Sequence, residues 1–151
     1  DHPLTNTAFL RTQIEMLPEY FAPGEVDEIW ITFPDPQLRT SKAKRRLTHP
    51  KFLRLFKNVL KPGGNIHLKT DSPALFYFTK RVIELYGLIL VEESEDVYSK
   101  PHKQELDIKT HYEGLDIAQS KKIHYLQFQL PQAIPDLDVQ LQEELKQTEN
   151  Q

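Results

Sequence analysis

The chain has 151 residues, a net charge of −3 and 38% hydrophobic residues, which is enough for one domain with its own core. Its pI near 6.1 excludes a generally basic nucleic-acid coat protein, so any contact with nucleic acid must come from a local patch. The absence of cysteine excludes disulfides and thiolate metal sites and fits the reducing cytoplasm, where we expect the protein to act.

The first elements along the chain are predicted to be one helix and one strand. Apolar residues at helix-like spacing predict a helix from Gln13 to Phe21, and Pro23-Gly24 follows as a turn. Residues 28–33 are mostly apolar and predict a strand that is buried on both faces. Such strands are typical of parallel sheets covered by helices, so we expect a sheet of that kind.

Two helices with clear ends are predicted next. The first opens at residues 48–50, where a proline follows Thr-His, and stops at residues 62–64, which read Pro-Gly-Gly. A strand over residues 65–70 separates it from the second helix. Ser72 and Pro73 begin that helix as N-cap and first helical residue, and Gly87 ends it.

The remaining chain is predicted to contain two strands and a tail. Residues 88–92 form a strand, residues 94–109 a polar loop, and residues 123–130 a final antiparallel strand. This order predicts an α/β fold that is half of an open, mostly parallel, doubly wound sheet. Residues 131–151 are acidic and glutamine-rich, and we expect a loosely held polar tail with at most a weak amphipathic helix.

The strongest functional signal lies in residues 31–46. An apolar strand leads directly into Asp35, which stands between two prolines, and five of the eight residues from Arg39 to Arg46 are Lys or Arg. A carboxylate at the C-terminal end of a strand is a common position for α/β chemistry, and a cationic cluster indicates a phosphate-bearing substrate. The plainer alternatives are a turn residue at Asp35 and a solvated charged loop after it.

Five segments, taken in order, resemble the tRNA (guanine-N7)-methyltransferase family. They are residues 33–36 (FPDP), 44–53 (KRRLTHPKFL), 60–64 (LKPGG), 67–71 (HLKTD) and 110–113 (THYE). The resemblance extends from about Phe9 to Phe128. It implies a Rossmann-like class I methyltransferase fold, S-adenosylmethionine as cofactor, tRNA as partner, and methylation of guanine N7 in the tRNA variable loop (position 46).

The resemblance also implies roles for individual residues, matched by position. Asp35 matches the active-site aspartate, which also lies at the edge of the cofactor, and Gln13 stands where the family usually places a cofactor-contacting aspartate. Arg39 and Asp71 match substrate-contacting positions. The rest of the guanine pocket matches Thr110, His111, Tyr112 and Glu113. The RNA-contacting stretch matches Ser41, Lys42, Lys44, Arg45 and Arg46.

Several positions depart from the family pattern. Gln37 replaces the usual Trp, Arg39 the usual Lys, Ser41-Lys42 a basic-His pair, and Gln13 a carboxylate. The family begins with a strand and a Gly-rich turn that hold the methionine end of the cofactor, whereas this chain has five glycines and no GxG. We therefore expect residues 1–130 to be the C-terminal part of a methyltransferase domain that lacks its N-terminal cofactor-binding strands and is inactive alone.

The reaction that the resemblance implies depends mainly on the correct placement of the guanine and the cofactor. Guanine N7 carries a lone pair and has no proton to lose before it attacks a sulfonium methyl group, so orientation and electrostatics should decide the rate. We hypothesise that Asp35 orients the guanine or the cofactor through hydrogen bonds. Asp71 and Glu113 are expected to accept from the guanine N1–H and N2–H₂ groups, and Thr110 to donate to O6. The plainer alternative for Asp71 is a cap of the helix that follows it.

Two other functions stay open at this point. One is a methyltransferase of the same fold acting on another substrate, and the other is a non-catalytic RNA-binding domain. The histidines lack metal-ligand spacing, so no metal site is predicted, and no apolar run approaches the roughly 20 residues that span a bilayer. The sequence leaves monomer and homodimer equally open.

Overall fold

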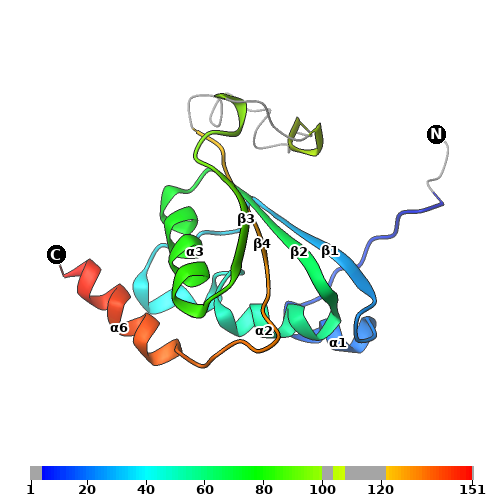
Figure 1. Ribbon diagram of the computed structural model, residues 1–151, viewed down its shortest axis with the longest axis horizontal. Coiled ribbons are helices and arrows are strands. Elements are labelled where there is room, and N and C mark those ends of the chain that lie inside the picture. Colours follow the sequence, from blue (N-terminus) through cyan, green and yellow to red (C-terminus); the bar gives the residue numbers. More distant parts are fainter. Residues whose placement is uncertain (1–4, 100–103, 108–121, 151) are drawn as a thin grey trace.

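The protein is an α/β fold built on one four-stranded mixed sheet (Figure 1). The computed structural model describes residues 5–99, 104–107 and 122–150. The strands are β1 (Val26–Thr32), β2 (Leu60–Thr70), β3 (Ile89–Ser94) and β4 (His124–Gln129). The α-helices are α1 (Leu17–Tyr20), α2 (Pro50–Val59), α3 (Pro73–Tyr86) and α6 (Asp138–Glu149). Short 3₁₀ helices are η1 (Ile14–Met16), η2 (Thr40–Arg45), η3 (Val97–Ser99) and η4 (Gln104–Asp107).

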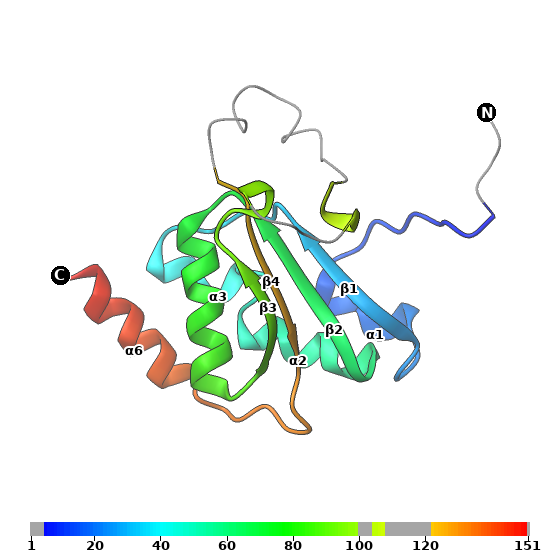
Figure 2. The ribbon, with the colours of Figure 1, turned by 45° about the horizontal axis from the view of Figure 1, so that its top comes forward.

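The sheet has the strand order β1-β2-β4-β3, and two of its three pairings are antiparallel (Figure 2). The expectation of a mostly parallel sheet is therefore wrong. Strand β4 is antiparallel as expected, but it lies between β2 and β3 and replaces a parallel pairing of those two strands with two antiparallel ones. Strands β1, β2 and β3 still run in the same direction, so their carboxyl ends meet at one edge of the sheet.

Helices α2 and α3 begin where their capping residues predict, but α2 ends at Val59, and the predicted stop at residues 62–64 lies in β2. His49 accepts a hydrogen bond from the Lys51 backbone N–H at 3.0 Å at the start of α2, and Ser72 accepts one from the Leu75 N–H at 3.2 Å at the start of α3. Gly87 ends α3 in the left-handed conformation, with φ of 69°. The predicted helix over residues 13–21 is instead split into η1 and α1, two short pieces.

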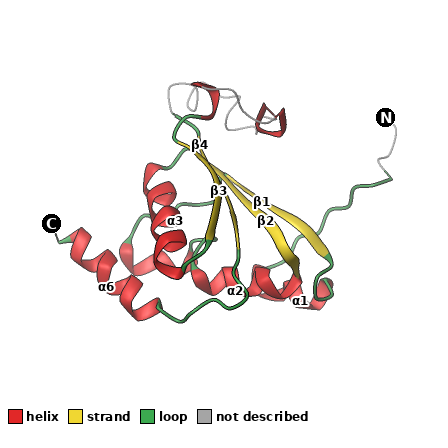
Figure 3. Ribbon diagram, in the orientation of Figure 1, coloured by secondary structure: helices red, strands yellow, loops and turns green. Residues whose placement is uncertain are grey.

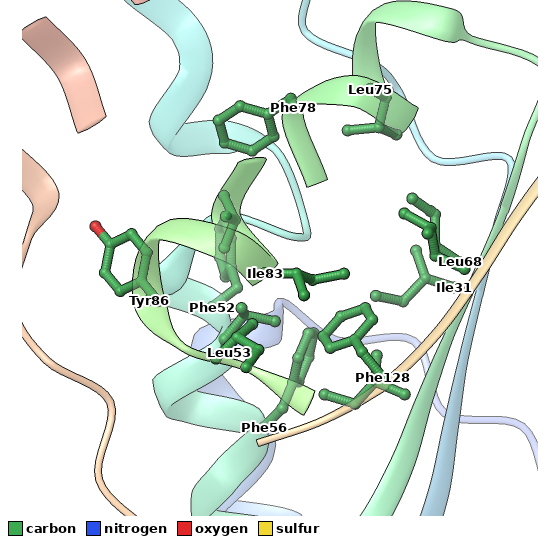
Figure 4. Close-up of a cluster of buried hydrophobic side chains, with 14 of the residues drawn as sticks. Ile31, Phe52, Leu53, Phe56, Leu68, Leu75, Phe78, Ile83, Tyr86 and Phe128 are labelled. Carbon is green, nitrogen blue, oxygen red and sulfur yellow. The ribbon is translucent and has the colours of Figure 1, made fainter. Parts of the chain in front are cut away.

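The main core lies between the helices and one face of the sheet (Figure 4). Alternate residues of the strands supply this face because side chains alternate between the two sides of a strand. The strand members are Ile31, Ile66, Leu68, Leu126 and Phe128. Helices α2 and α3 cover them with aromatic and aliphatic side chains, among them Phe52, Leu53, Phe56, Leu75, Phe78 and Ile83.

The opposite face of the sheet carries a smaller, partly polar cluster. The Trp30 and His67 rings stack with centroids 3.9 Å apart and an interplanar angle of 4°. His67 Nδ1 is 2.7 Å from the Tyr125 hydroxyl, and Tyr125 packs with Val97 and neighbouring apolar residues. This arrangement satisfies a fully buried histidine with an aromatic neighbour and a hydrogen bond.

Helix α6 is firmly attached, so the expectation of a loosely held tail is wrong. Leu141 is 1% exposed and belongs to the main core. Asp138 accepts hydrogen bonds from the Arg54 guanidinium at 2.8 and 2.9 Å and from the Tyr86 hydroxyl at 2.6 Å. In Figure 3 this helix lies along the outer side of α3. No helix in the described ranges is long and apolar enough to cross a membrane.

Candidate active site

Asp35 lies in an irregular loop that leaves the carboxyl end of β1. We call residues 33–39 the Asp35 loop. Two of its non-glycine residues, Phe33 and Gln37, have positive φ angles of 50° and 47°. Asp35 is exposed, and its Oδ1 accepts a hydrogen bond from the Gln37 backbone N–H at 3.0 Å. The carboxylate therefore shapes the turn between the prolines and remains accessible to a ligand.

A cavity of about 770 Å³ brings Asp71 together with the Asp35 loop. We call it the polar cavity. Its lining consists of Pro36, Leu38, Asp71, Ser72, Pro73, Ala74, Tyr77, Glu95, Lys122 and His124. Asp71 directly follows β2, and Pro36 and Leu38 are the sequence neighbours of Asp35, Gln37 and Arg39. The capping hydrogen bond of α3 comes from Ser72, so Asp71 is not needed for that role.

His124 is a lining residue that the sequence prediction missed. It is 5% exposed, and its ring stacks on Phe76 with centroids 4.7 Å apart. Its Nδ1 has no hydrogen-bond partner among the described residues, and burial lowers the pKa of the ring, which favours the neutral form. The alternation of β4 places this first strand residue on the same face as Leu126 and Phe128, and that signal was available in the sequence.

The residues of the predicted RNA-contacting stretch divide into exposed and buried members. Ser41, Lys44 and Arg45 are exposed and Lys42 is half-buried on η2, which the buried Ala43 anchors. Arg39 is exposed at the start of η2.

Arg46 differs from these neighbours because it is only 5% exposed. Its Nε donates to the Gln37 carbonyl oxygen at 3.0 Å and its guanidinium to the Leu38 carbonyl oxygen at 3.4 Å. Burial lowers the pKa of Arg46. The guanidinium therefore contacts the backbone of the Asp35 loop.

A second hollow, of about 490 Å³, lies along β1 and includes Pro34 of the Asp35 loop in its lining. We call it the apolar hollow. Its lining includes Ile14, Leu17, Trp30, Pro34 and Leu47. Gln13 is exposed and precedes Ile14, and Asp35 follows Pro34, so both predicted cofactor-contacting residues are sequence neighbours of residues that line this hollow. Asp35 is the residue between Pro34, which lines the apolar hollow, and Pro36, which lines the polar cavity.

The remaining predicted pocket residues, Thr110, His111, Tyr112 and Glu113, lie outside the described residues. Within the ranges that are described, no group of three or more His, Cys, Asp or Glu side chains is placed to hold a metal ion.

Comparison with known proteins gives consistent similarities. Residues 1–126 match a family described as "Putative methyltransferase". The chain is 49% identical over 129 residues to a tRNA (guanine-N(7)-)-methyltransferase of Porphyromonas gingivalis. The aligned region covers 84% of this chain and 52% of that protein. The chain is 43% identical over 143 residues to the same-named protein of Bacteroides thetaiotaomicron, covering 91% of this chain and 56% of that one. The chain spans about half the length of the curated relatives it matches.

Proposed function

Because this chain belongs to the methyltransferase family of the tRNA (guanine-N7)-methyltransferases, as its sequence predicts, we propose that it takes part in methylating guanine N7 of tRNA with S-adenosylmethionine. The target is a guanine of the variable loop. The finer fold is Rossmann-like class I, of which the β1–α2–β2 unit and α3–β3 form one part. The site of action is the cytoplasm, where the proposed substrate is found.

The observation that carries this proposal is that the two prolines flanking Asp35 line two spaces of different character. The apolar hollow beside Pro34 suits the uncharged part of a nucleoside cofactor, and Gln13 and Asp35 would hold it there. The polar cavity beside Pro36 carries Asp71, His124 and Glu95, whose acceptor atoms suit the N–H groups of a guanine. A residue whose two sequence neighbours line these spaces can align the two reactants.

The residues have a limited chemical task. S-adenosylmethionine supplies the electrophilic methyl group when it is bound. Asp35 orients the guanine or the cofactor, and Asp71 accepts from the guanine N1–H and N2–H₂ edge, which leaves N7 free on the opposite edge. No general base is needed, because N7 carries no proton, so alignment accounts for most of the rate.

The cations of η2 provide the second half of substrate binding. Arg39 is the last residue of the Asp35 loop, and Lys42, Lys44 and Arg45 follow it on η2, with Lys44 and Arg45 exposed to solvent. They would bind tRNA phosphates and hold the guanine-bearing loop against the cavity. A fold of this kind acting on a small molecule would have no use for this patch, and a non-catalytic RNA-binding domain would have no use for Asp35.

The test compares two aspartates of the protein expressed from its complete gene. We expect Asp35→Asn to lower kcat/KM for methylation of unmodified tRNA by about 100-fold, as expected when reacting atoms lose alignment. Asp27→Asn is the matched control, since Asp27 lies on β1 with an 83% exposed side chain and only a 3.8 Å ion pair to Lys61. Mass spectrometry of the tRNA product identifies the methylated atom.

The outcomes separate the rival functions. Methylation of tRNA at guanine N7 that depends on Asp35 supports the proposal. A wild-type protein that binds tRNA and transfers no methyl group supports the non-catalytic domain. Methyl transfer to another acceptor, without methylation of tRNA, supports a methyltransferase of the same fold that acts on a different substrate.

A further inference from the structure

We propose that Arg46 is a positioning residue that holds the Asp35 loop in its reactive arrangement, and that it does not contact RNA phosphates. The inference deepens the proposed function and rests on it for the role of Asp35. It separates Arg46 from Lys42, Lys44 and Arg45, with which it shares one continuous basic stretch.

The contacts of Arg46 are those of a buried structural cation. Its Nε lies 3.0 Å from the Gln37 carbonyl oxygen and its guanidinium 3.4 Å from the Leu38 carbonyl oxygen, so one planar group donates to two consecutive peptide units. The same guanidinium lies 4.5 Å from the ring centroid of Phe78 on α3. A guanidinium can donate in its plane and stack on its face at the same time, which an ammonium group cannot do.

The Asp35 loop has a conformation that needs such support. Positive φ angles at Phe33 and Gln37 are unfavourable for residues with a side chain and persist where surrounding contacts fix them. Gln37 is bonded through both of its backbone groups. Its carbonyl oxygen accepts from Arg46, and its N–H donates to Asp35 at 3.0 Å. Arg46 is therefore one residue removed from the proposed catalytic carboxylate.

The other end of this chain of contacts leads to the polar cavity. Phe78 belongs to α3, whose N-cap Ser72 directly follows Asp71. Through Phe78 and the two carbonyl groups, Arg46 connects the helix that begins beside Asp71 with the loop that carries Asp35. Loss of this link should let the two carboxylates move relative to each other while the exposed cations stay in place.

Burial separates the two possible roles of a cation in this stretch. A phosphate contact requires a guanidinium or ammonium group that the nucleic acid can reach, as with the exposed Arg45 and Lys44. Arg46 is 95% removed from solvent and directs its donors at the protein backbone. Removing a charge from water is costly and is tolerated where hydrogen bonds compensate for it, as they do here.

The first experiment compares Arg46→Lys with Arg45→Gln in the protein expressed from its complete gene. Arg46→Lys keeps the positive charge and loses the planar two-carbonyl contact. We expect its kcat at saturating tRNA to fall at least about 10-fold, while its tRNA affinity and the dependence of log K on log salt stay at wild-type values. Arg45→Gln should weaken tRNA binding and lower the salt slope by about 0.7–0.9.

The second experiment does not depend on activity and uses the 151-residue chain itself. Amide hydrogen exchange of residues 33–39 should accelerate by up to about tenfold in Arg46→Lys, the equivalent of one lost hydrogen bond, and stay unchanged in Arg45→Gln. Phe78→Leu keeps every charge and removes the stacked ring. This variant should accelerate exchange of the same residues, and it provides the test of the proposal if Arg46→Lys does not fold.

The results that overturn this proposal are distinct from those that overturn the function. Unchanged exchange in both Arg46→Lys and Phe78→Leu refutes the positioning role, as does a reduced salt slope in Arg46→Lys. If exchange accelerates while the wild-type protein methylates no tRNA, the link between Arg46 and the Asp35 loop stands and the proposed function fails.

Discussion

The carboxylate of Asp35 combines a structural contact with an exposed position. One oxygen accepts the Gln37 N–H, which is the ordinary behaviour of an aspartate in a turn. Asp35 is therefore a turn residue, as the plainer interpretation predicts, and this role is compatible with a catalytic one. A side chain fixed by its own turn presents its carboxylate in one orientation, which is what alignment of two reactants requires.

At the residue scale, the sequence predicts the cationic stretch but cannot rank its members. Arg45 and Arg46 are adjacent and chemically identical, yet one is exposed and the other is 5% exposed. The difference arises because Arg46 follows the end of η2 and meets the Gln37 carbonyl group and Phe78, which is 32 positions further along the chain. Such long-range contacts leave no local pattern in the sequence.

The exposed cations give a prediction about salt. We expect the double substitution Lys44→Gln and Arg45→Gln to lower tRNA affinity and to reduce the slope of log K against log salt by about 1.4–1.8, because each neutralised phosphate contributes about 0.7–0.9. Fluorescence titration of tRNA at several salt concentrations measures both values. Lys57→Gln in the last turn of α2 and Lys61→Gln in β2 form the control pair. An equal effect of this pair would show that the overall charge of the protein, and not a local patch, determines RNA binding.

At the scale of elements, local signals predict the start of α2 and both ends of α3, because the capping residues lie at those ends, but they place the end of α2 too late. They predict the strand β4 but miss its place between β2 and β3, which depends on pairings with residues 31 to 64 positions away. For α6 they indicate a weak amphipathic helix but miss its attachment. Its weak apolar periodicity gives little reason to expect a buried Leu141, and its attachment depends on Arg54, Arg81 and Tyr86 from distant helices.

The attachment of α6 predicts a dependence of stability on pH. Hydrogen bonds from Arg54, with a further one from Tyr86, lower the pKa of Asp138. A carboxyl group with a lowered pKa in the folded state stabilises the fold above its unfolded pKa of about 3.9, and this contribution disappears as the pH falls through the folded value. We expect Asp138→Asn to cost about 1–2 kcal/mol at pH 7 and much less near pH 3.

Urea unfolding at the two pH values measures this difference. Asp136→Asn is the matched control, because Asp136 is 85% exposed and 3.9 Å from Arg54, and asparagine keeps the Oδ1 that accepts from the Asp138 backbone N–H. A cost for Asp138→Asn that stays the same at both pH values would show that the carboxylate charge does not hold α6.

At the scale of the whole molecule, the two spaces beside the Asp35 loop differ in how complete they are. Strand β1 is at the edge of the sheet, and the apolar hollow runs along it. The polar cavity, in contrast, is lined from several elements, including α3 and both ends of the segment between β3 and β4. The described part of the chain therefore forms more of the proposed guanine site than of the proposed cofactor site.

This asymmetry predicts different ligand affinities. We expect the 151-residue chain alone to bind S-adenosylmethionine weakly and to transfer no methyl group, because it contains no Gly-rich GxG turn. It should still bind tRNA through the cations of η2. Calorimetry with each ligand, beside the product of the complete gene, measures both affinities. Turnover of unmodified tRNA by the 151-residue chain would contradict the prediction.

The stack of Trp30 on His67 gives this sheet an optical reporter. The chain has a single tryptophan, and it lies opposite His67 in the register of β1 and β2. The indole and the imidazole are in face-to-face contact only while these two parallel strands remain paired. Intrinsic emission thus follows the separation of the edge strand from its neighbour, with no dye or label attached to the protein.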